Sequence, residues 1–198
     1  PDINCIKKHG FYHSGHLHSS NSVVLSLSKI KDVAKKHRAT LNDVITALAS
    51  TTLHEWFKLK GDKKTTISVG LPFAFRNIPR DVHQYEYGNQ FVAATLYLKL
   101  LEKFEDAIAF SRAEVTRQVK QNSPAGWYLL VKAQQLFYGP AKNAGVNREA
   151  GAKYTLLLSN VPGFVKPTTI FGSPLKRFFY VGSGAGSITT GIYVVSVC

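Results

Sequence analysis

Apolar and polar residues follow each other along this chain in periods that predict a series of short helices and strands. Residues 22–28 alternate with the two-residue period of a half-buried strand, and residues 29–37 repeat apolar side chains at helical spacing. A longer helix is expected over residues 41–59, because a hydroxyl followed three residues later by an acid marks its start and Gly61 follows its end. The first third of the chain therefore predicts a strand and two helices.

The rest of the chain continues in the same way, and no pattern repeats. Two β-rich stretches flank a long, charged loop, and the first and last of the three final strands are nearly continuous in apolar residues, so we expect both in the centre of a covered sheet. The order of elements predicts an α/β fold, a two-layer sandwich of helices on a mixed β-sheet. The expected elements are strands at 65–72 and 89–98, helices at 104–121 and 127–138, and strands at 154–159, 174–181 and 187–197.

The first 21 residues show neither helical nor strand periodicity, and we interpret them as a linker or arm in front of a single domain over residues 22–198. The arm contains His13, His16 and His18, whose imidazoles could bind a metal such as zinc. No cluster of further ligands accompanies them in the sequence. We interpret them as solvated histidines and predict no metal site.

Composition narrows the class of protein. The chain has 198 residues, of which 44% are hydrophobic and 19% charged, as expected for an ordered globular protein. No apolar run approaches the roughly 20 residues that a membrane-spanning helix needs. Cys5 and Cys198 are the two cysteines, and we expect them to be unrelated thiols.

The net charge of +13 favours acidic partners, among them nucleic acid, anionic lipid headgroups and phosphorylated cofactors. Clustered lysines at 29–36 and 58–64 have no nucleic-acid-binding motif beside them, so we interpret them as solvated helix faces and predict no specific nucleic acid. A glycine-rich stretch at 182–186 is followed by a strand where a phosphate-binding loop needs a helix. We interpret it as a hairpin-like loop.

Two polar stretches are stronger candidates for a site. Ser159 and Asn160 follow an apolar strand, where polar side chains often face a ligand, although the segment could equally be a plain turn. Asn42 and Asp43 lie in the first turn of the long helix, where capping is the simplest role for them.

Four short motifs, taken together, resemble one family. Their order and approximate spacing are those of the C-terminal half of a wax ester synthase / acyl-CoA:diacylglycerol acyltransferase, of the chloramphenicol-acetyltransferase-like superfamily. The resemblance covers about residues 22–198. The motifs are Thr40-Leu41-Asn42-Asp43-Val44, Val69-Gly70-Leu71-Pro72-Phe73-Ala74-Phe75-Arg76, Gly88-Asn89-Gln90 and Leu158-Ser159-Asn160-Val161-Pro162-Gly163.

The resemblance implies a pseudo-dimer of two similar α/β domains with a channel between them. Acyl-CoA as co-substrate and a fatty alcohol or diacylglycerol would enter this channel, and no cofactor would be permanently bound. The family's general base is the second His of an H-H-x-x-x-D-G motif in the N-terminal half, and this sequence has no His-His pair. We therefore expect no catalytic residue in this chain, and as its partner the N-terminal half of the same protein or a cleaved chain.

By the same resemblance, site residues are assigned to the channel and to the turn that follows it. A peripheral membrane or lipid-droplet surface is expected to supply the lipid substrates, at the endoplasmic reticulum in a eukaryote or the inner membrane in a bacterium. Channel or substrate-binding roles are assigned to Asn42, Asp43, Arg76, Asn89, Ser159 and Asn160, and a structural turn to Pro162 and Gly163.

Two further expectations follow from the comparison with the family. The family's domain continues beyond the last strand with a further strand and a helix, so we expect the domain to be incomplete at its C-terminus. The alternative to an acyltransferase is a non-catalytic protein that retains the fold, either binding a lipid or pigment or serving as a structural subunit.

Overall fold

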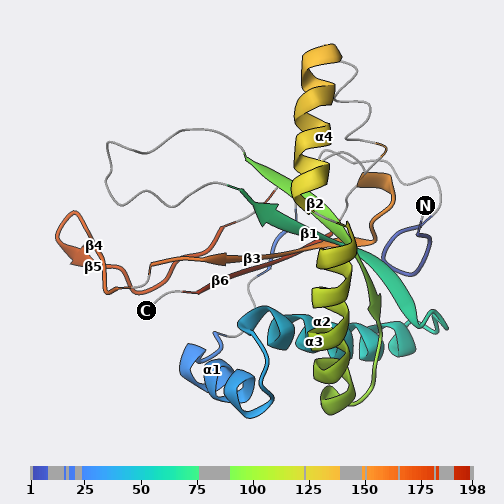
Figure 1. Cartoon of the computed structure of the whole chain (residues 1–198). Coiled ribbons are helices and arrows are strands. Elements are labelled where there is room, and N and C mark those ends of the chain that lie inside the picture. The colour runs from blue at the N-terminus through green and yellow to red at the C-terminus, as the bar shows by residue number, and fades with distance from the viewer. Residues whose placement is uncertain are drawn as a thin grey trace.

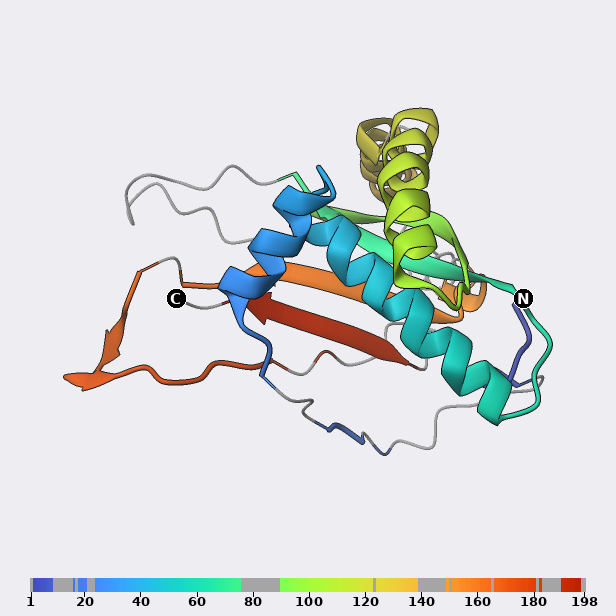
Figure 2. The ribbon, with the colours of Figure 1, turned by 90° about the horizontal axis from the view of Figure 1, so that it is seen from below.

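A computed structural model describes residues 2–8, 16, 18–20, 24–75, 90–122, 124–138, 149, 151–164, 166–180, 182 and 190–196. In this part of the chain, a four-stranded sheet carries helices α1 to α3 on one side, and helix α4 projects away from it on the other (Figure 1). The view from below shows α1 and α2 lying across the sheet (Figure 2). The helices are α1 (Leu27–Lys36), α2 (Leu41–Leu59), α3 (Phe104–Asn122) and α4 (Pro124–Phe137).

The sheet is mixed and has the strand order β2-β1-β3-β6. β1 and β2 pair antiparallel along their whole length, whereas β3 runs parallel to both β1 and β6. A separate two-stranded ribbon, β4 with β5, extends from the end of the sheet (Figure 1). The strands are β1 (Thr66–Ala74), β2 (Phe91–Lys99), β3 (Leu156–Pro162), β4 (Thr169–Ile170), β5 (Ser173–Pro174) and β6 (Gly191–Ser196).

Helix α2 begins and ends where the sequence predicts. The Thr40 hydroxyl accepts from the backbone N–H of Asp43, and the Asp43 carboxylate accepts in return from the backbone N–H of Thr40, which forms a capping box. At the other end Gly61 has φ +68°, a conformation that favours glycine, and the following N–H of Asp62 donates to Phe57 O. Local sequence signals therefore determine both ends of α2.

The main core lies between α2 and the sheet. Ile67 and Val69 of β1 and Leu156 and Leu158 of β3 face the apolar side of α2, as the two-residue period of a strand requires. A second, smaller cluster joins α1, α2 and α3. Residues between these on the strands face the opposite side of the sheet.

Buried Ser50 of α2 fixes the chain that leads from the sheet to α3. Its hydroxyl donates to Lys99 O at 2.6 Å and accepts from the N–H of Leu101 at 3.1 Å. These two backbone groups lie at and just beyond the end of β2. The serine hydroxyl therefore gives both of them a hydrogen-bond partner where the sheet ends.

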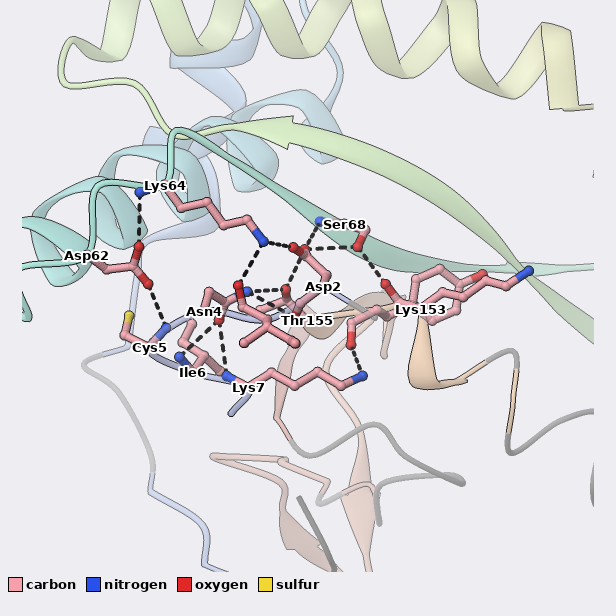
Figure 3. Close-up of polar contacts among 12 residues, drawn as sticks. Asp2, Asn4, Cys5, Ile6, Lys7, Asp62, Lys64, Ser68, Lys153 and Thr155 are labelled. Atoms are coloured by element: carbon pink, nitrogen blue, oxygen red, sulfur yellow. Dashed lines mark hydrogen bonds and ion pairs between the residues drawn. The ribbon is translucent and has the colours of Figure 1, made fainter. Parts of the chain in front are cut away.

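Residues 2–8 have no helix or strand, yet they are bound to the sheet face opposite α2 (Figure 3). The Asp2 carboxylate accepts from the backbone N–H of Ser68 at 2.6 Å and from the hydroxyls of Ser68 and Thr155 at 2.9 and 2.7 Å, and it forms an ion pair with Lys64. Burial alone would raise the pKa of Asp2, but the hydrogen bonds from Lys64, Ser68 and Thr155 outweigh it and lower the pKa. The segment is therefore attached through a charged side chain.

A buried lysine gives the same segment a second attachment. Lys7 Nζ donates to the backbone oxygens of Ala152 at 2.7 Å, Tyr154 at 2.6 Å and Gly151 at 3.3 Å. Burial lowers the pKa of this ammonium, and the Asp2 carboxylate partly offsets the effect. Residues 1–21 were predicted to form a linker or arm, and their first described part is held against the domain. The domain division at residue 21 stays a prediction.

Three predicted strands need correction. No described residue of the expected strand at 22–28 is extended in a sheet, because Ser26 caps α1 and Leu27 already belongs to that helix. Among the described residues of the expected strand at 174–181, only Pro174 lies in a strand, and residues 175–180 are not paired in a sheet. β6 was expected at the centre but is the last strand in the described order, with every residue half-buried.

Two further findings concern the described residues alone. None of their helices is both long and apolar enough to cross a membrane. Cys5 is a free thiol whose pKa is raised by burial and by the nearby Asp62 carboxylate. The other cysteine, Cys198, lies outside the described residues.

Candidate functional site

The centre of the candidate site is a pair of asparagines from two motifs far apart in the sequence. Asn160 Nδ2 donates to Asn42 Oδ1 at 2.6 Å, which joins the first turn of α2 to β3. Asn42 is exposed, whereas Oδ1 of Asn160 is buried and has no hydrogen-bond partner within the part of the chain that the structure describes. A buried amide oxygen without a donor costs stability unless a further group supplies one.

Asp43, next to Asn42, is occupied by its own helix. Its Oδ2 atom accepts from both the backbone N–H and the hydroxyl of Thr40, at 2.7 and 2.8 Å, and the residue is 4% exposed. The carboxylate therefore stabilises the start of α2 and holds the turn on which Asn42 lies. Its assignment to the channel stays a prediction.

Ser159 points to the other side of the sheet from Asn160, because successive side chains of a strand alternate between its faces. The Ser159 hydroxyl accepts from Tyr180 Oη at 3.0 Å, and the Tyr180 ring packs edge-to-face on Tyr193 with centroids 5.3 Å apart. Burial, and to a lesser degree Tyr180, raises the pKa of Tyr193. The Ser-Asn dipeptide thus contributes to two separate polar contacts, one on each face.

Tyr180 was not among the residues that the sequence singled out. It ends the aromatic run Phe178-Phe179-Tyr180, which we interpreted as part of a strand. A phenol in an otherwise apolar run usually needs a hydrogen-bond partner when buried, and this is the signal that could have identified it.

Of the remaining predicted site residues, those that the structure describes are not brought to this pair. Arg76 and Asn89 lie outside the described residues. Pro162 is the last residue of β3 and pairs with Ser196, and the N–H of Gly163 donates to Ser196 O at 2.8 Å. These two residues continue the β3–β6 ladder where the sequence predicted a turn, because β6 extends alongside them.

A surface groove of about 630 Å³ lies beside the start of α2. Two arginines line the groove. The guanidinium group of one of them, Arg112, donates through Nη1 to the backbone oxygen of His37 at 2.9 Å. Asn42 does not line this groove. The lining residues are Arg38, Thr40, Asp43, Ala109, Arg112, Ala113 and Thr116.

The two histidines of the described helical region are engaged away from the asparagine pair. The His37 ring packs edge-to-face on Phe104 with centroids 6.0 Å apart, and His54 Nδ1 lies 3.4 Å from Leu100 O. Among the described residues, no three His, Cys, Asp or Glu side chains gather closely enough to hold a metal ion. The asparagine pair can therefore orient and hydrogen-bond a ligand, but it has no acid or base of its own.

Comparison with known proteins identifies the family and the fold of this chain. Residues 87–198 match the family model described as WS/DGAT C-terminal domain. A solved wax ester synthase/diacylglycerol acyltransferase from Marinobacter aquaeolei VT8 is similar with a TM-score of 0.50 and 16% identity over 76% of this chain and 33% of that chain. The first condensation domain of the CDA synthetase aligns with a TM-score of 0.47 and 13% identity over 85% and 33%. A search of curated proteins found no match.

The match to the solved acyltransferase concerns the fold. This chain spans about a third of that structure's length, 33%. The mixed sheet covered by helices is a chloramphenicol-acetyltransferase-like α/β fold, so the predicted fold class is confirmed.

Proposed function

Because this chain belongs to the WS/DGAT C-terminal domain family, we propose that it is the C-terminal half of an O-acyltransferase. The reaction transfers a fatty acyl group from acyl-CoA to a long-chain alcohol or a diacylglycerol. Acyl-CoA is a co-substrate, and no permanently bound cofactor is required. The hydrogen bond between Asn42 and Asn160 is the observation that carries this proposal, since it joins two of the four motifs on which the resemblance rests.

The chemistry defines what this half must supply. The acceptor hydroxyl loses its proton to a base, its oxygen attacks the thioester carbonyl, and the C–S bond breaks as the CoA thiolate leaves and takes up the proton. We assign Asn42 and Asn160 the positioning of the acceptor or of the base. The buried, unpartnered Oδ1 of Asn160 suits this role because it can accept from a hydroxyl or an imidazole N–H.

The base belongs to another segment. The sequence has no His-His pair, and His37 and His54 have neighbours of their own. A His-His-x-x-x-Asp-Gly segment from an N-terminal half, in the same polypeptide or in a cleaved partner, would face the asparagine pair. The basic surface, with a net charge of +13, suits the phosphates of CoA.

The first experiment asks whether that second half exists. Intact mass and peptide mapping of the purified protein, under native and denaturing conditions, would detect a polypeptide with this motif travelling with the chain. The assembly would then be assayed with palmitoyl-CoA and either hexadecanol or dioleoylglycerol. Turnover supports the proposal. An assembly that contains the motif and holds a hydrophobic ligand without turnover would instead favour the non-catalytic binding protein.

Variants of the pair test the positioning role. We expect Asn160→Ala and Asn42→Ala each to lower kcat about 100-fold, because misplaced reactants lose much of the advantage of a fixed geometry. If the two act as a pair, the double variant loses little more than either single one. Glu55→Gln, at an exposed position farther along α2, is the matched control and should leave kcat unchanged. Equal activity of Asn160→Ala and the control would overturn the assignment.

A further inference from the structure

Helix α4 carries an apolar stripe on its outward side. Leu129, Leu130, Leu136 and Phe137 are 67%, 55%, 85% and 82% exposed, and Ala133 between them is exposed too. Their spacing, i, i+1, i+4, i+7 and i+8, places all five on one face of a helix. No described residue of α4 is buried, and Figure 1 shows the helix projecting away from the sheet.

The opposite side of α4 attaches it to the domain. Tyr128 stacks on Phe75, just beyond the end of β1, with ring centroids 4.8 Å apart and planes 25° apart. Val131, one turn after Tyr128 and on the same side, is half-buried. A helix of a globular domain normally turns its apolar stripe to the core and its polar side to water. In α4 a further apolar stripe faces outward as well, so it is available to something outside the described domain.

The charge of the sequence around α4 indicates what kind of surface could bind the stripe. Between Glu114 and Glu149 the sequence has no acidic residue, whereas α4 itself carries Lys132. A sequence segment that is rich in basic residues and contains an exposed apolar stripe matches an anionic lipid surface, which offers negative headgroups above an apolar interior, although Arg117 is already paired with Glu114. The basic residues of this acid-free stretch are Arg117, Lys120, Lys132, Lys142 and Arg148.

The aromatic residues of α4 agree with a position at an interface. Trp127 in the first turn and Tyr138 just beyond the last are 51% and 43% exposed. Both residue types are enriched where headgroups meet hydrocarbon, because their rings are apolar and one edge is polar. With 14 residues, α4 is too short to cross a bilayer but long enough to lie in its surface.

We propose that α4 is the element through which this protein binds an anionic membrane surface, with the stripe Leu129, Leu130, Ala133, Leu136 and Phe137 in the acyl layer. The proposal rests on the lipid substrates of the proposed function, to which it gives a docking surface. Its test requires no turnover, so it succeeds or fails separately from acyl transfer.

Flotation of the full chain with vesicles provides the test. The chain should float with vesicles of phosphatidylcholine and 30% phosphatidylserine, and less with phosphatidylcholine alone. Leu136→Asp should weaken this partitioning at least about tenfold, because it puts a charge where the bound protein would insert a leucine into the acyl layer. Leu59→Asp is the matched control: Leu59 is also a helical leucine, 75% exposed, but on α2, and its replacement should leave partitioning unchanged.

Fluorescence locates the contact. The chain has two tryptophans, so in a Trp56→Phe background the emission comes from Trp127 alone, and it should shift to the blue on adding the anionic vesicles. Equal partitioning of the Leu136→Asp and Leu59→Asp variants would overturn the proposal. So would a loss of self-association, or of binding to a second polypeptide, in Leu136→Asp with flotation unchanged, because the stripe would then be a protein interface.

Discussion

Replacing Asp2 by Asn tests whether residues 2–8 contribute to the stability of the domain. The Asp2 carboxylate faces two sets of donors, Lys64 Nζ on one oxygen and the groups of Ser68 and Thr155 on the other (Figure 3). An asparagine amide has a single acceptor oxygen. The favoured orientation keeps this oxygen on the Ser68 and Thr155 donors, now as neutral hydrogen bonds, and turns the NH₂ group toward Lys64.

The size of the effect follows from these contacts. A hydrogen bond to a charged group contributes about 1.5–3 kcal/mol and a neutral one about 1 kcal/mol, so the bonds from Ser68 and from the fully buried Thr155 all weaken. The ion pair adds little, because the Lys64 side chain is 35% exposed. We therefore expect Asp2→Asn to lower the free energy of unfolding at pH 7 by about 2–3 kcal/mol, which for a chain of this size corresponds to a Tm lower by about 5–10 °C.

The same substitution should flatten the acid limb of the stability profile. The pKa of Asp2 is lower in the folded state than in the unfolded chain, so the unfolded state binds more protons as the pH falls. Its contribution is fully present above about pH 4 and is lost progressively below, toward the folded pKa. The wild-type chain should therefore lose more stability than the variant as the pH falls through this window.

Urea unfolding followed by tryptophan fluorescence and near-UV circular dichroism measures both effects. Asp32→Asn, at an exposed position on α1, is the matched control. If Asp2→Asn and Asp32→Asn unfold within about 0.5 kcal/mol of each other at pH 7, the attachment of residues 2–8 does not stabilise the domain and the reasoning is refuted.

Three further substitutions test the packing of the domain. Ser50→Ala leaves two partly buried backbone groups without this partner and should cost about 1–2 kcal/mol in urea unfolding, whereas Thr52→Ala, exposed on the same helix, should cost nothing. Gly191→Ala places a Cβ within 2.6 Å of Tyr193 Cζ, so it should cost about 1–3 kcal/mol and alter the near-UV spectrum of the displaced ring. Thr40→Ala breaks the capping box and should lower Tm by about 2–4 °C, measured by thermal unfolding.

Local signals account for the elements that the sequence predicted well. Helix α2 has a capping hydroxyl at Thr40 and a glycine at Gly61 in the conformation that favours it, and both signals lie within a few residues of the ends that they determine. β1, β2 and α3 likewise follow apolar periods that need no knowledge of the rest of the chain. The family assignment was also accessible, because motifs in order along a sequence survive at low overall identity. The match of residues 87–198 to the family model confirms this assignment.

What the sequence missed depends on contacts between distant residues. Asp2 and Thr155 are separated by 153 positions, and nothing in the polar, irregular start of the chain indicates that it meets β3. The alternation at 22–28 is that of a strand, yet the Ser26 hydroxyl accepts from the backbone N–H of Lys29 and caps a helix that begins at Leu27. A strand needs a neighbour that sequence period alone does not provide.

In the candidate site, too, the local sequence predicts some features, whereas contacts between distant residues determine others. The motif Ser159-Asn160 was predicted at the end of an apolar strand, but it lies within β3, whose two-residue period turns the two polar side chains to opposite faces. Asn160 meets Asn42 on the side of α2, whereas Ser159 meets Tyr180 on the other. Only one of these faces can line a given channel. If the site lies beside Asn42, as we propose, Ser159 and Tyr180 act on the packing of β3, and Ser159→Ala should lower stability with little effect on kcat. A loss of kcat in Ser159→Ala as large as that in Asn160→Ala, at unchanged stability, would place the channel on both sides of β3.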